Sequence, residues 1–271
     1  MDLSPIADRG LVLLGCGKMG TALLEGWLAG GVAPASVTVL EPKPSPRLAE
    51  LAGAGLRLNA ELPPHPAVAV LAVKPQMMGE ALPRLAALGN GDTLFVSIAA
   101  GTPIRSFEAA LGARTPIVRA MPNTPAAVGR GITALVANAH ANAGARDLAE
   151  VLMRAVGQTV RLDDEAQMDA VTAVSGSGPA YVFLMIEALA AAGEAEGLSP
   201  ELALARATVA GAGALAESND RAPTALRVDV TSPGGTTAAA LAVLMEEGTG
   251  LPALVRRGVA AAAARSRELA G

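Results

Sequence analysis

Short, uninterrupted apolar runs recur along the first part of the chain, separated by segments with helical periodicity. Runs of this kind are typical of strands that are buried on both faces, as in a parallel sheet covered by helices. The strands that the pattern predicts lie at 11–14, 37–40, near Leu56, and at 67–73, 94–98, 116–120, 132–137 and 158–162.

Helical periodicity occupies the intervals between these runs. Thr102 and Pro103 suit the N-cap and the first turn of one predicted helix. The helices that the periodicity predicts lie at 21–29, 47–54, 77–88 and 103–111. Strands that alternate with helices in this way predict an α/β fold with a doubly wound parallel sheet.

Strand signals stop after Asp163. The rest of the chain is rich in Ala, Leu and Met. Turn residues punctuate it at 175–179, 197–200, 218–223 and 231–235. The pattern predicts two domains, an α/β domain at 1–163 and an all-helical domain at 164–271.

A glycine-rich turn joins the first predicted strand to the first predicted helix. In the pattern G-x-G-x-x-G the first glycine makes the tight turn, the second lets the backbone approach a pyrophosphate, and the third lets helix and strand pack closely. The helix N-terminus adds N–H donors for the anion. The turn predicts a Rossmann-type dinucleotide site, with a purely structural turn as the alternative. Its residues are Gly15, Cys16, Gly17, Lys18, Met19 and Gly20.

The acidic residue that such a site uses for the ribose is Glu41. It lies 21 residues beyond Gly20, at the end of the second predicted strand. A carboxylate here favours NADH, because it accepts from a ribose 2′-hydroxyl and repels a 2′-phosphate. Lys43 and Arg47 follow closely, and they could pair with that phosphate or be solvated loop charges. The sequence leaves both NADPH and NADH open.

Charge and cysteine content narrow the class of protein. The formal net charge is −4, so no basic excess is available to neutralise nucleic-acid phosphates, and we expect no nucleic-acid partner. The single cysteine excludes an intramolecular disulfide and fits a reducing compartment. No apolar run approaches the ~20 residues that cross a bilayer, and no signal peptide is visible before Arg9. We expect a cytoplasmic protein with no membrane partner.

Side chains that could move a proton are scarce. The lysines are Lys18, Lys43 and Lys74, and the histidines, His65 and His140, lie in segments typical of surface loops. Reduction of a carbonyl usually needs such a group. A protonated cyclic imine arrives with its proton and needs orientation and hydrogen bonding instead. The scarcity favours an imine substrate and weighs against a β-hydroxyacid dehydrogenase, which would have a lysine in its helical domain.

Six segments resemble the signatures of the pyrroline-5-carboxylate reductase family. They are GCGKMG at 15–20, AVKPQ at 72–76, SIAAG at 97–101, RAMPNTPA at 119–126, AVSGSGPAYVF at 173–183 and VTSPGGTT at 230–237. Their order and spacing match along nearly the whole chain. The resemblance implies hydride transfer from NADPH or NADH to the cyclic imine of 1-pyrroline-5-carboxylate, which gives L-proline in the last step of proline biosynthesis.

The resemblance also implies a set of cofactor-binding residues. Lys74 and Pro75 follow the central strand, at the carboxyl edge where open α/β sheets bind ligands. Asn123 is implied near the nicotinamide, with a structural Asn turn as the alternative, and Asn59 on the adenosine side. Glu41 departs from the family, which often has a small polar residue there, and this puts a preference for NADP in doubt. The full set is Gly15, Cys16, Gly17, Lys18, Met19, Gly20, Glu41, Lys43, Asn59, Val73, Lys74, Pro75, Ala99, Ala100, Gly101 and Asn123.

The segment VTSPGGTT opens a predicted helix, so its N–H groups can cradle an anion. By resemblance the loop holds the substrate carboxylate, with Gly234, Gly235 and Thr236 as substrate-binding residues. Thr237 is implied to hydrogen-bond the ring nitrogen, and Ser232 to support the loop. An N-cap with tight helix packing is the alternative.

A second serine-rich turn starts another long helix. Ser177 is expected to face the substrate, although a capping role is an equal alternative for Ser175 and Ser177. No metal is implied.

The resemblance implies a homodimer formed through the helical domain, and further assembly to a decamer. Ala-rich stripes in that domain fit this expectation, because a small helical domain alone would expose apolar faces. Two other functions stay open from the residues alone. One is another NAD(P)-dependent imine or hydroxyacid reductase on the same two-domain plan, and the other is a non-catalytic dinucleotide-binding protein.

Overall fold

The computed structural model describes residues 3–269, which form two compact units. The sheet unit is Met1–Gly176 together with Ala263–Gly271, and the helical unit is Ser177–Ala262. The division falls after Gly176, later than the expected domain boundary after Asp163. The difference arises because residues 165–176 are helical and yet hydrogen-bond to loops at one edge of the sheet.

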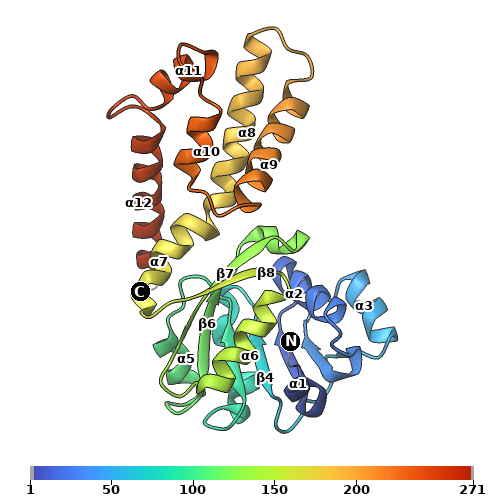
Figure 1. The fold of residues 1–271 in the computed structure, drawn as a ribbon. Helices are drawn as coiled ribbons and strands as arrows, with labels where there is room; N and C mark the ends of the chain where they lie inside the picture. Colours follow the sequence, from blue (N-terminus) through green and yellow to red (C-terminus); the bar gives the residue numbers. More distant parts are fainter. Residues whose placement is uncertain (1–2, 270–271) are drawn as a thin grey trace. The chain divides into compact units, whose positions relative to one another are not determined.

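The sheet unit is built on eight strands (Figure 1). Their order is β3-β2-β1-β4-β5-β6-β7-β8, so β1 lies between β2 and β4. All the predicted strands are confirmed apart from their ends. They are β1 (Leu11–Leu14), β2 (Val37–Leu40), β3 (Arg57–Leu58), β4 (Val68–Leu71), β5 (Leu94–Ser97), β6 (Ile117–Met121), β7 (Gly131–Ala137) and β8 (Gly157–Arg161).

The predicted doubly wound parallel sheet is confirmed, with one antiparallel pair of strands toward one edge. The first six strands are parallel to their neighbours, but β7 runs antiparallel to β6. Residues 122–130, which connect β6 to β7, are too few for a usual crossover, so the chain turns back on itself. Helix α6 (Ala143–Arg154) then links β7 to β8, and these two strands are parallel to each other.

Both faces of the central strands β1, β2, β4 and β5 are buried, which explains their uninterrupted apolar runs. Along β1, Leu11 and Leu13 belong to one core while Val12 and Leu14 belong to the other. Helices α1 (Ser4–Arg9), α2 (Lys18–Ala29), α3 (Pro46–Gly53) and α6 cover the first core. The second core is covered by α4 (Met78–Ala81), the 3₁₀ segment η3 (Leu82–Leu88) and α5 (Ile104–Leu111).

Two helix predictions need correction. The helix expected at 77–88 is mostly 3₁₀, because Pro83 has no N–H to continue α-helical bonding. Thr102 is not the N-cap of α5, which is Pro103. The remaining short elements are η1 (Pro34–Ser36), η2 (Pro75–Met77), η4 (Thr124–Val128), η5 (Glu165–Gln167), α7 (Met168–Val171) and a π-helical turn, η6 (Thr172–Gly176).

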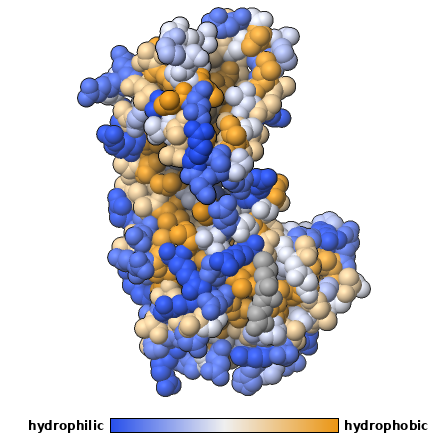
Figure 2. Space-filling view, in the orientation of Figure 1, coloured by the Kyte–Doolittle hydropathy of each residue, from blue (hydrophilic) through white to orange (hydrophobic). Residues whose placement is uncertain are grey.

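The helical unit exposes an unusual amount of apolar surface. Its elements are α8 (Gly178–Ala195), α9 (Glu201–Glu217), α10 (Pro223–Asp229), α11 (Thr236–Leu244) and most of α12 (Leu251–Leu269). Helices α8 and α9 pack closely, with the Cβ position of Gly193 at 3.3 Å from the Glu201 side chain. Phe183 is nevertheless 58% exposed and Val243 is 72% exposed. Figure 2 shows hydrophobic patches on the visible surface of these helices.

Among the described residues, one helical stretch is long and apolar enough to cross a membrane, Glu165–Ala195. The expectation that no such stretch exists is wrong, because a search for uninterrupted apolar runs misses a stretch in which charged and hydroxyl side chains are interspersed. By itself this is weak support for a membrane span, because helices of soluble proteins pass the same test.

The connection between β1 and α2 depends on close backbone contact. Gly15 has φ +89°, a conformation that residues with a side chain rarely adopt. A Cβ atom on Gly20 would lie 2.6 Å from the Gly15 carbonyl oxygen, and a Cβ on Gly15 would lie 2.7 Å from Cγ1 of Val73. Glycine at both positions therefore lets α2 begin directly against the end of β1.

Gly20→Ala should destabilise the protein by about 1–3 kcal/mol, because the added methyl forces α2 away from Gly15. Chemical denaturation of the two proteins measures this difference. The matched control is Gly53→Ala, in helix α3, where no atom lies within 4 Å of the new Cβ. We expect that control to be as stable as the parent or slightly more so. Equal stability of Gly20→Ala and Gly53→Ala would contradict the role of the close contact.

Candidate functional site

The candidate cofactor site lies where the parallel strands of the sheet end. The carboxyl ends of β1, β2, β4, β5 and β6 share one edge, since these strands are parallel. The chain order reverses at β1, which has β2 on one side and β4 on the other. Open α/β sheets bind ligands in the crevice at such a switch point. Each predicted cofactor segment except Asn59 directly follows one of these strands.

The glycine loop has the geometry of an anion site. Gly17 is the N-cap of α2, and no atom lies within 4 Å of its Cβ position, so a phosphate can approach the backbone there. The N–H groups of the first turn of α2 are available as donors. Of the residues in the motif, Lys18 is exposed, whereas Met19 packs against the core and supports the helix.

Glu41 links the end of β2 to this loop. Its Oε2 accepts from the Cys16 N–H at 2.8 Å and its Oε1 from the Lys43 N–H at 3.0 Å. Asn59 holds the backbone of Glu41 by two hydrogen bonds, donating from Nδ2 to the carbonyl oxygen and accepting at Oδ1 from the N–H, both at 2.9 Å. The carboxylate is therefore fixed beside the glycine loop, and Asn59 acts on it through the backbone.

The two cations near Glu41, Arg47 and Lys43, differ in whether they are free to bind a ligand. The guanidinium of Arg47 donates to Glu25 at 2.6 and 3.2 Å and to Glu50 at 3.2 Å. The hydrogen bonds from Arg47 lower the pKa of Glu25, and those carboxylates raise the pKa of Arg47 above its ordinary value. Arg47 is thus already paired, while Lys43 is exposed.

The Cys16 side chain lies within the loop and is 8% exposed. Burial raises the pKa of its thiol, and the thiol lies 3.5 Å from the hydroxyl of Thr21. The thiol is therefore protonated at neutral pH and packs as a small apolar group rather than acting as a nucleophile.

The segments after β4 and β5 complete the crevice. Val73 packs against the Cβ position of Gly15, and Lys74 and Pro75 follow it on the surface. Ala99 is buried, Ala100 is exposed, and Gly101 has φ +69°. Small side chains here leave space for a bound ring.

Asn123, after β6, is held at both ends of its amide. Oδ1 accepts from the Ile132 N–H at 3.0 Å, and Nδ2 donates to Oγ of Ser175 at 3.3 Å. Ser175 lies in the π-helical turn η6, a type of turn that is frequent at functional sites. The structure thus gives Ser175 a polar partner in the sheet unit, in place of the capping role weighed from the sequence.

The predicted substrate loop lies in the helical unit. Gly235 N–H donates to the Ser232 carbonyl oxygen at 3.0 Å, and Gly234 at φ +69° completes a tight turn. Gly235 is the N-cap of α11, whose first two residues are Thr236 and Thr237. The N–H groups of this first turn have no intrahelical acceptor, so the loop can bind a carboxylate.

Ser177 is the N-cap residue of α8, also in the helical unit, and its side chain makes no capping hydrogen bond. Ser177 is partly buried as a residue. The capping alternative for Ser177 is therefore not supported.

Sequence reasoning missed one polar cluster at the cofactor edge. Arg119 is 5% exposed inside β6, and Glu165 accepts its guanidinium proton at 2.8 Å. An arginine within an otherwise apolar strand was the available signal, because a buried charge requires a partner. Nothing in the sequence pointed to Glu165, which lies 46 positions away.

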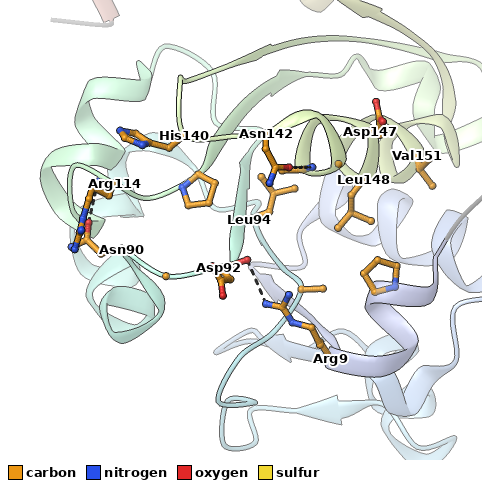
Figure 3. A pocket seen from close by; sticks show the side chains of 16 residues that line it. Arg9, Asn90, Asp92, Leu94, Arg114, His140, Asn142, Asp147, Leu148 and Val151 are labelled. Carbon is orange, nitrogen blue, oxygen red and sulfur yellow. Dashed lines mark hydrogen bonds between the residues drawn. The ribbon is translucent and has the colours of Figure 1, made fainter.

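A sizeable cavity lies away from the candidate cofactor site. A hollow of about 840 Å³ occupies the opposite, amino edge of the strands, beside the start of α6 (Figure 3). Arg9 there donates to the backbone oxygens of His65, Pro66 and Asp92, at 3.0, 3.1 and 3.4 Å. Asp147 is paired with Arg161. These groups stabilise the fold, and the hollow lacks the glycine loop that dinucleotide binding requires.

The chemistry available at the two sets of residues is orientation and hydrogen bonding. No group of three or more His, Cys, Asp or Glu side chains within residues 3–269 is placed to hold a metal ion. The substrate loop offers hydroxyls and backbone N–H groups. Such groups suit a substrate that already carries its proton.

Comparison with known proteins gives two family matches. Residues 165–269 match the family described as pyrroline-5-carboxylate reductase dimerisation, and residues 10–101 match the family of NADP oxidoreductases that are coenzyme F420-dependent. A pyrroline-5-carboxylate reductase from Pseudomonas aeruginosa is 45% identical over 96% of both chains. One from Pisum sativum is 38% identical over 99% of this chain and 100% of the other.

Solved structures agree with these matches. A pyrroline-5-carboxylate reductase from Coxiella burnetii superposes with a TM-score of 0.90 at 35% identity, covering 97% of this chain and 99% of the other. Another from Plasmodium falciparum, with NADP bound, has a TM-score of 0.83 at 29% identity, covering 97% and 99%. With the dinucleotide crevice and the glycine turn before α11 both present, the chain belongs to the pyrroline-5-carboxylate reductase family.

Proposed function

We propose that this protein reduces the cyclic imine of 1-pyrroline-5-carboxylate to L-proline with a nicotinamide dinucleotide. The observation that carries the proposal is the turn Ser232–Gly235 and the start of α11, in a chain of this family. That turn presents N–H groups and threonine hydroxyls without a general acid, as a protonated imine requires.

We assign the site residues separate roles in binding the cofactor and the substrate. The glycine loop binds the pyrophosphate, and the segments at Val73–Pro75, Ala99–Gly101 and Asn123 surround the nicotinamide, which supplies the hydride when bound. The N–H groups at the start of α11 hold the substrate carboxylate. Thr237 hydrogen-bonds the ring nitrogen, which keeps its proton and becomes an amine when carbon accepts the hydride. Ser232 supports the turn through its carbonyl oxygen.

Thr237→Ala should lower kcat/KM for the imine on the order of 100-fold, because one hydrogen bond to the reacting group is lost. Binding of the dinucleotide should be unchanged, since its residues belong to the sheet unit. The value of kcat/KM is measured from the absorbance change as the reduced cofactor is oxidised with pyrroline-5-carboxylate as substrate. Binding of the dinucleotide is measured by titration of the protein with the cofactor.

Thr224→Ala is the matched control for this experiment. Thr224 is an exposed second residue of α10, as Thr237 is the second residue of α11, so its loss should leave the rate unchanged. Absence of turnover by the parent protein with both NADH and NADPH would disprove the proposed function. Full activity of Thr237→Ala would instead disprove only the role of that residue.

We propose further that NADH is the preferred cofactor. The Glu41 carboxylate is fixed beside the glycine loop by two N–H groups, where it would repel a 2′-phosphate and accept from ribose hydroxyls. Arg47, a candidate partner for that phosphate, is engaged by Glu25 and Glu50. Of the two cations Lys43 and Arg47, this leaves Lys43 to pair with a 2′-phosphate, and an exposed lysine contributes little to the binding of such a group.

Glu41→Gln should shift the ratio of kcat/KM values for NADPH over NADH upward by roughly tenfold or more, because a like-charge contact is removed. Steady-state assays with each cofactor measure the ratio. The control Glu61→Gln changes an exposed carboxylate elsewhere and should leave the ratio unaltered. A parent enzyme that favours NADPH, or a ratio that Glu41→Gln does not change, would contradict this preference.

We propose that the protein is a homodimer formed through the helical unit, with assembly to decamers as an extension of it. The match of residues 165–269 to a dimerisation family and the exposed apolar side chains of α8 support the dimer. Burial of such side chains contributes about 25 cal/mol per Å². Helix α8, which forms the last part of the apolar stretch Glu165–Ala195, is then an interface helix rather than part of a membrane span.

Replacing both Phe183 and Leu184 with Glu should shift the sedimenting mass toward the monomer, because two charges would have to be buried in the interface. Phe183 is 58% exposed and Leu184 is 64% exposed within one chain. Val128→Glu, at a 77% exposed apolar position in the sheet unit, is the control and should leave the mass unchanged. A monomeric parent protein would contradict the proposed dimer.

A further inference from the structure

One carboxylate oxygen joins three segments of the sheet unit. Oε1 of Glu165 accepts from the guanidinium Nη1 of Arg119 at 2.8 Å and from the backbone N–H of Ile104 at 2.9 Å. Glu165 opens the helical stretch that follows β8, Arg119 belongs to β6, and Ile104 is the first residue of α5. A single side chain therefore fixes the distance between the ends of these segments.

Because the Arg119 guanidinium is buried, it needs the Glu165 carboxylate as a partner. The side chain of Arg119 is 6% exposed and that of Glu165 is 30% exposed. A buried guanidinium that loses its carboxylate is strongly destabilising, because the charge has left water without compensation. The pair also replaces a helix cap, since the N–H of Ile104 is one of the first donors of α5 and has no intrahelical acceptor.

Both donors adjoin the segments assigned to the nicotinamide. Ile104 follows Ala99–Gly101 after two intervening residues, and Arg119 precedes Asn123 by four positions. The helical turns that follow Glu165 also contact the end of β6 and the residues after it. Ser175 accepts from Asn123, and the Cβ position of Gly176 lies 2.6 Å from Cε of Met121.

The C-terminal end of α12 adds one more tie to the same place. Ser266, which is 5% exposed, donates to Oδ1 of Asp169 at 2.6 Å. Leu269 lies 3.4 Å from the Cβ position of Gly101. Residues 165–176 thus lie between the last turns of α12 and the segments after β5 and β6 that are assigned to the nicotinamide, which we call the nicotinamide loops.

We propose that Glu165 is a positioning residue for hydride transfer. Through Arg119 and the Ile104 N–H it sets the loop after β5 and the end of β6, and these orient the nicotinamide ring. The inference rests on the proposed dinucleotide-dependent reduction. It adds that residues of the first helical turns belong to the cofactor site, although they touch the loops rather than the reacting atoms.

A positioning role and a merely structural role have different consequences. The adenosine half of the cofactor would be held by the glycine loop and Glu41, and neither is bonded to Glu165 among the described residues. Misplacing the nicotinamide loops should therefore slow hydride transfer while the other half of the dinucleotide binds normally. General loss of stability would weaken both halves alike.

The test uses Glu165→Gln and Arg119→Met in the full-length protein. Glu165→Gln keeps an oxygen for the Ile104 N–H but removes the charge opposite Arg119, whereas Arg119→Met removes the buried cation. We expect kcat for the imine to fall roughly tenfold or more in each. The dissociation constant of the reduced dinucleotide should rise, and that of ADP-ribose, which lacks the nicotinamide, should not change.

Glu150→Gln is the matched control. Glu150 is a carboxylate of the same unit with a side chain 12% exposed, and it pairs with Arg154 and Arg161. Its loss should lower the melting temperature while leaving kcat and both dissociation constants at the parent values. If Glu165→Gln does not fold, the double variant Arg119→Met/Glu165→Gln removes both buried charges and should fold with the same kinetic defect.

The proposal is overturned if the Glu165 and Arg119 variants keep the parent kcat, or if ADP-ribose binding weakens in proportion to dinucleotide binding. Failure of the proposed function would look different. The parent protein would then show no imine reduction, while the contrast between dinucleotide and ADP-ribose binding would still be measurable.

Discussion

The close approach of α2 to the end of β1 is the contact on which the cofactor edge depends. It is possible because Gly15 adopts a positive φ and Gly20 has no Cβ, so the Gly15 carbonyl oxygen can lie against the first turn of the helix. This contact directs the N-terminus of α2 at the crevice beside β4. The direction of the first N–H groups of α2, the position of Val73 and the hydrogen bond from the Cys16 N–H to Glu41 all follow from it.

Glu41 serves the fold and is also the residue on which the proposed cofactor preference rests. The carboxylate joins the ends of β1 and β2 through the Cys16 and Lys43 N–H groups, and Asn59 fixes its backbone. Since the charge is held in place by these hydrogen bonds, the proposed discrimination against a 2′-phosphate would need no rearrangement. The side chain of Asn59 is bonded to the backbone of Glu41, a partner that its position in the sequence did not reveal.

The helical turns at 165–176 belong physically to the sheet unit. Glu165, Ser175 and Gly176 each contact a segment at the carboxyl edge, so the compact units divide after Gly176. Sequence periodicity placed the boundary where strand signals stop, after Asp163. Periodicity reports which secondary structure a segment forms, but it carries no information about which neighbour that segment packs against.

The sequence by itself determined the strands, the two-part organisation and the dinucleotide turn, because buried parallel strands and G-x-G-x-x-G are local patterns with direct physical causes. It also determined the family, through motifs that include Thr237 and Lys74. Only the tertiary structure decided the antiparallel turn of β7, the engagement of Arg47 by Glu25, and the Arg119–Glu165 pair. Strand periodicity carries no direction, so it left the antiparallel run of β7 open. The two ion pairs join residues distant in the chain, and partners of that kind are selected by folding and not by local spacing.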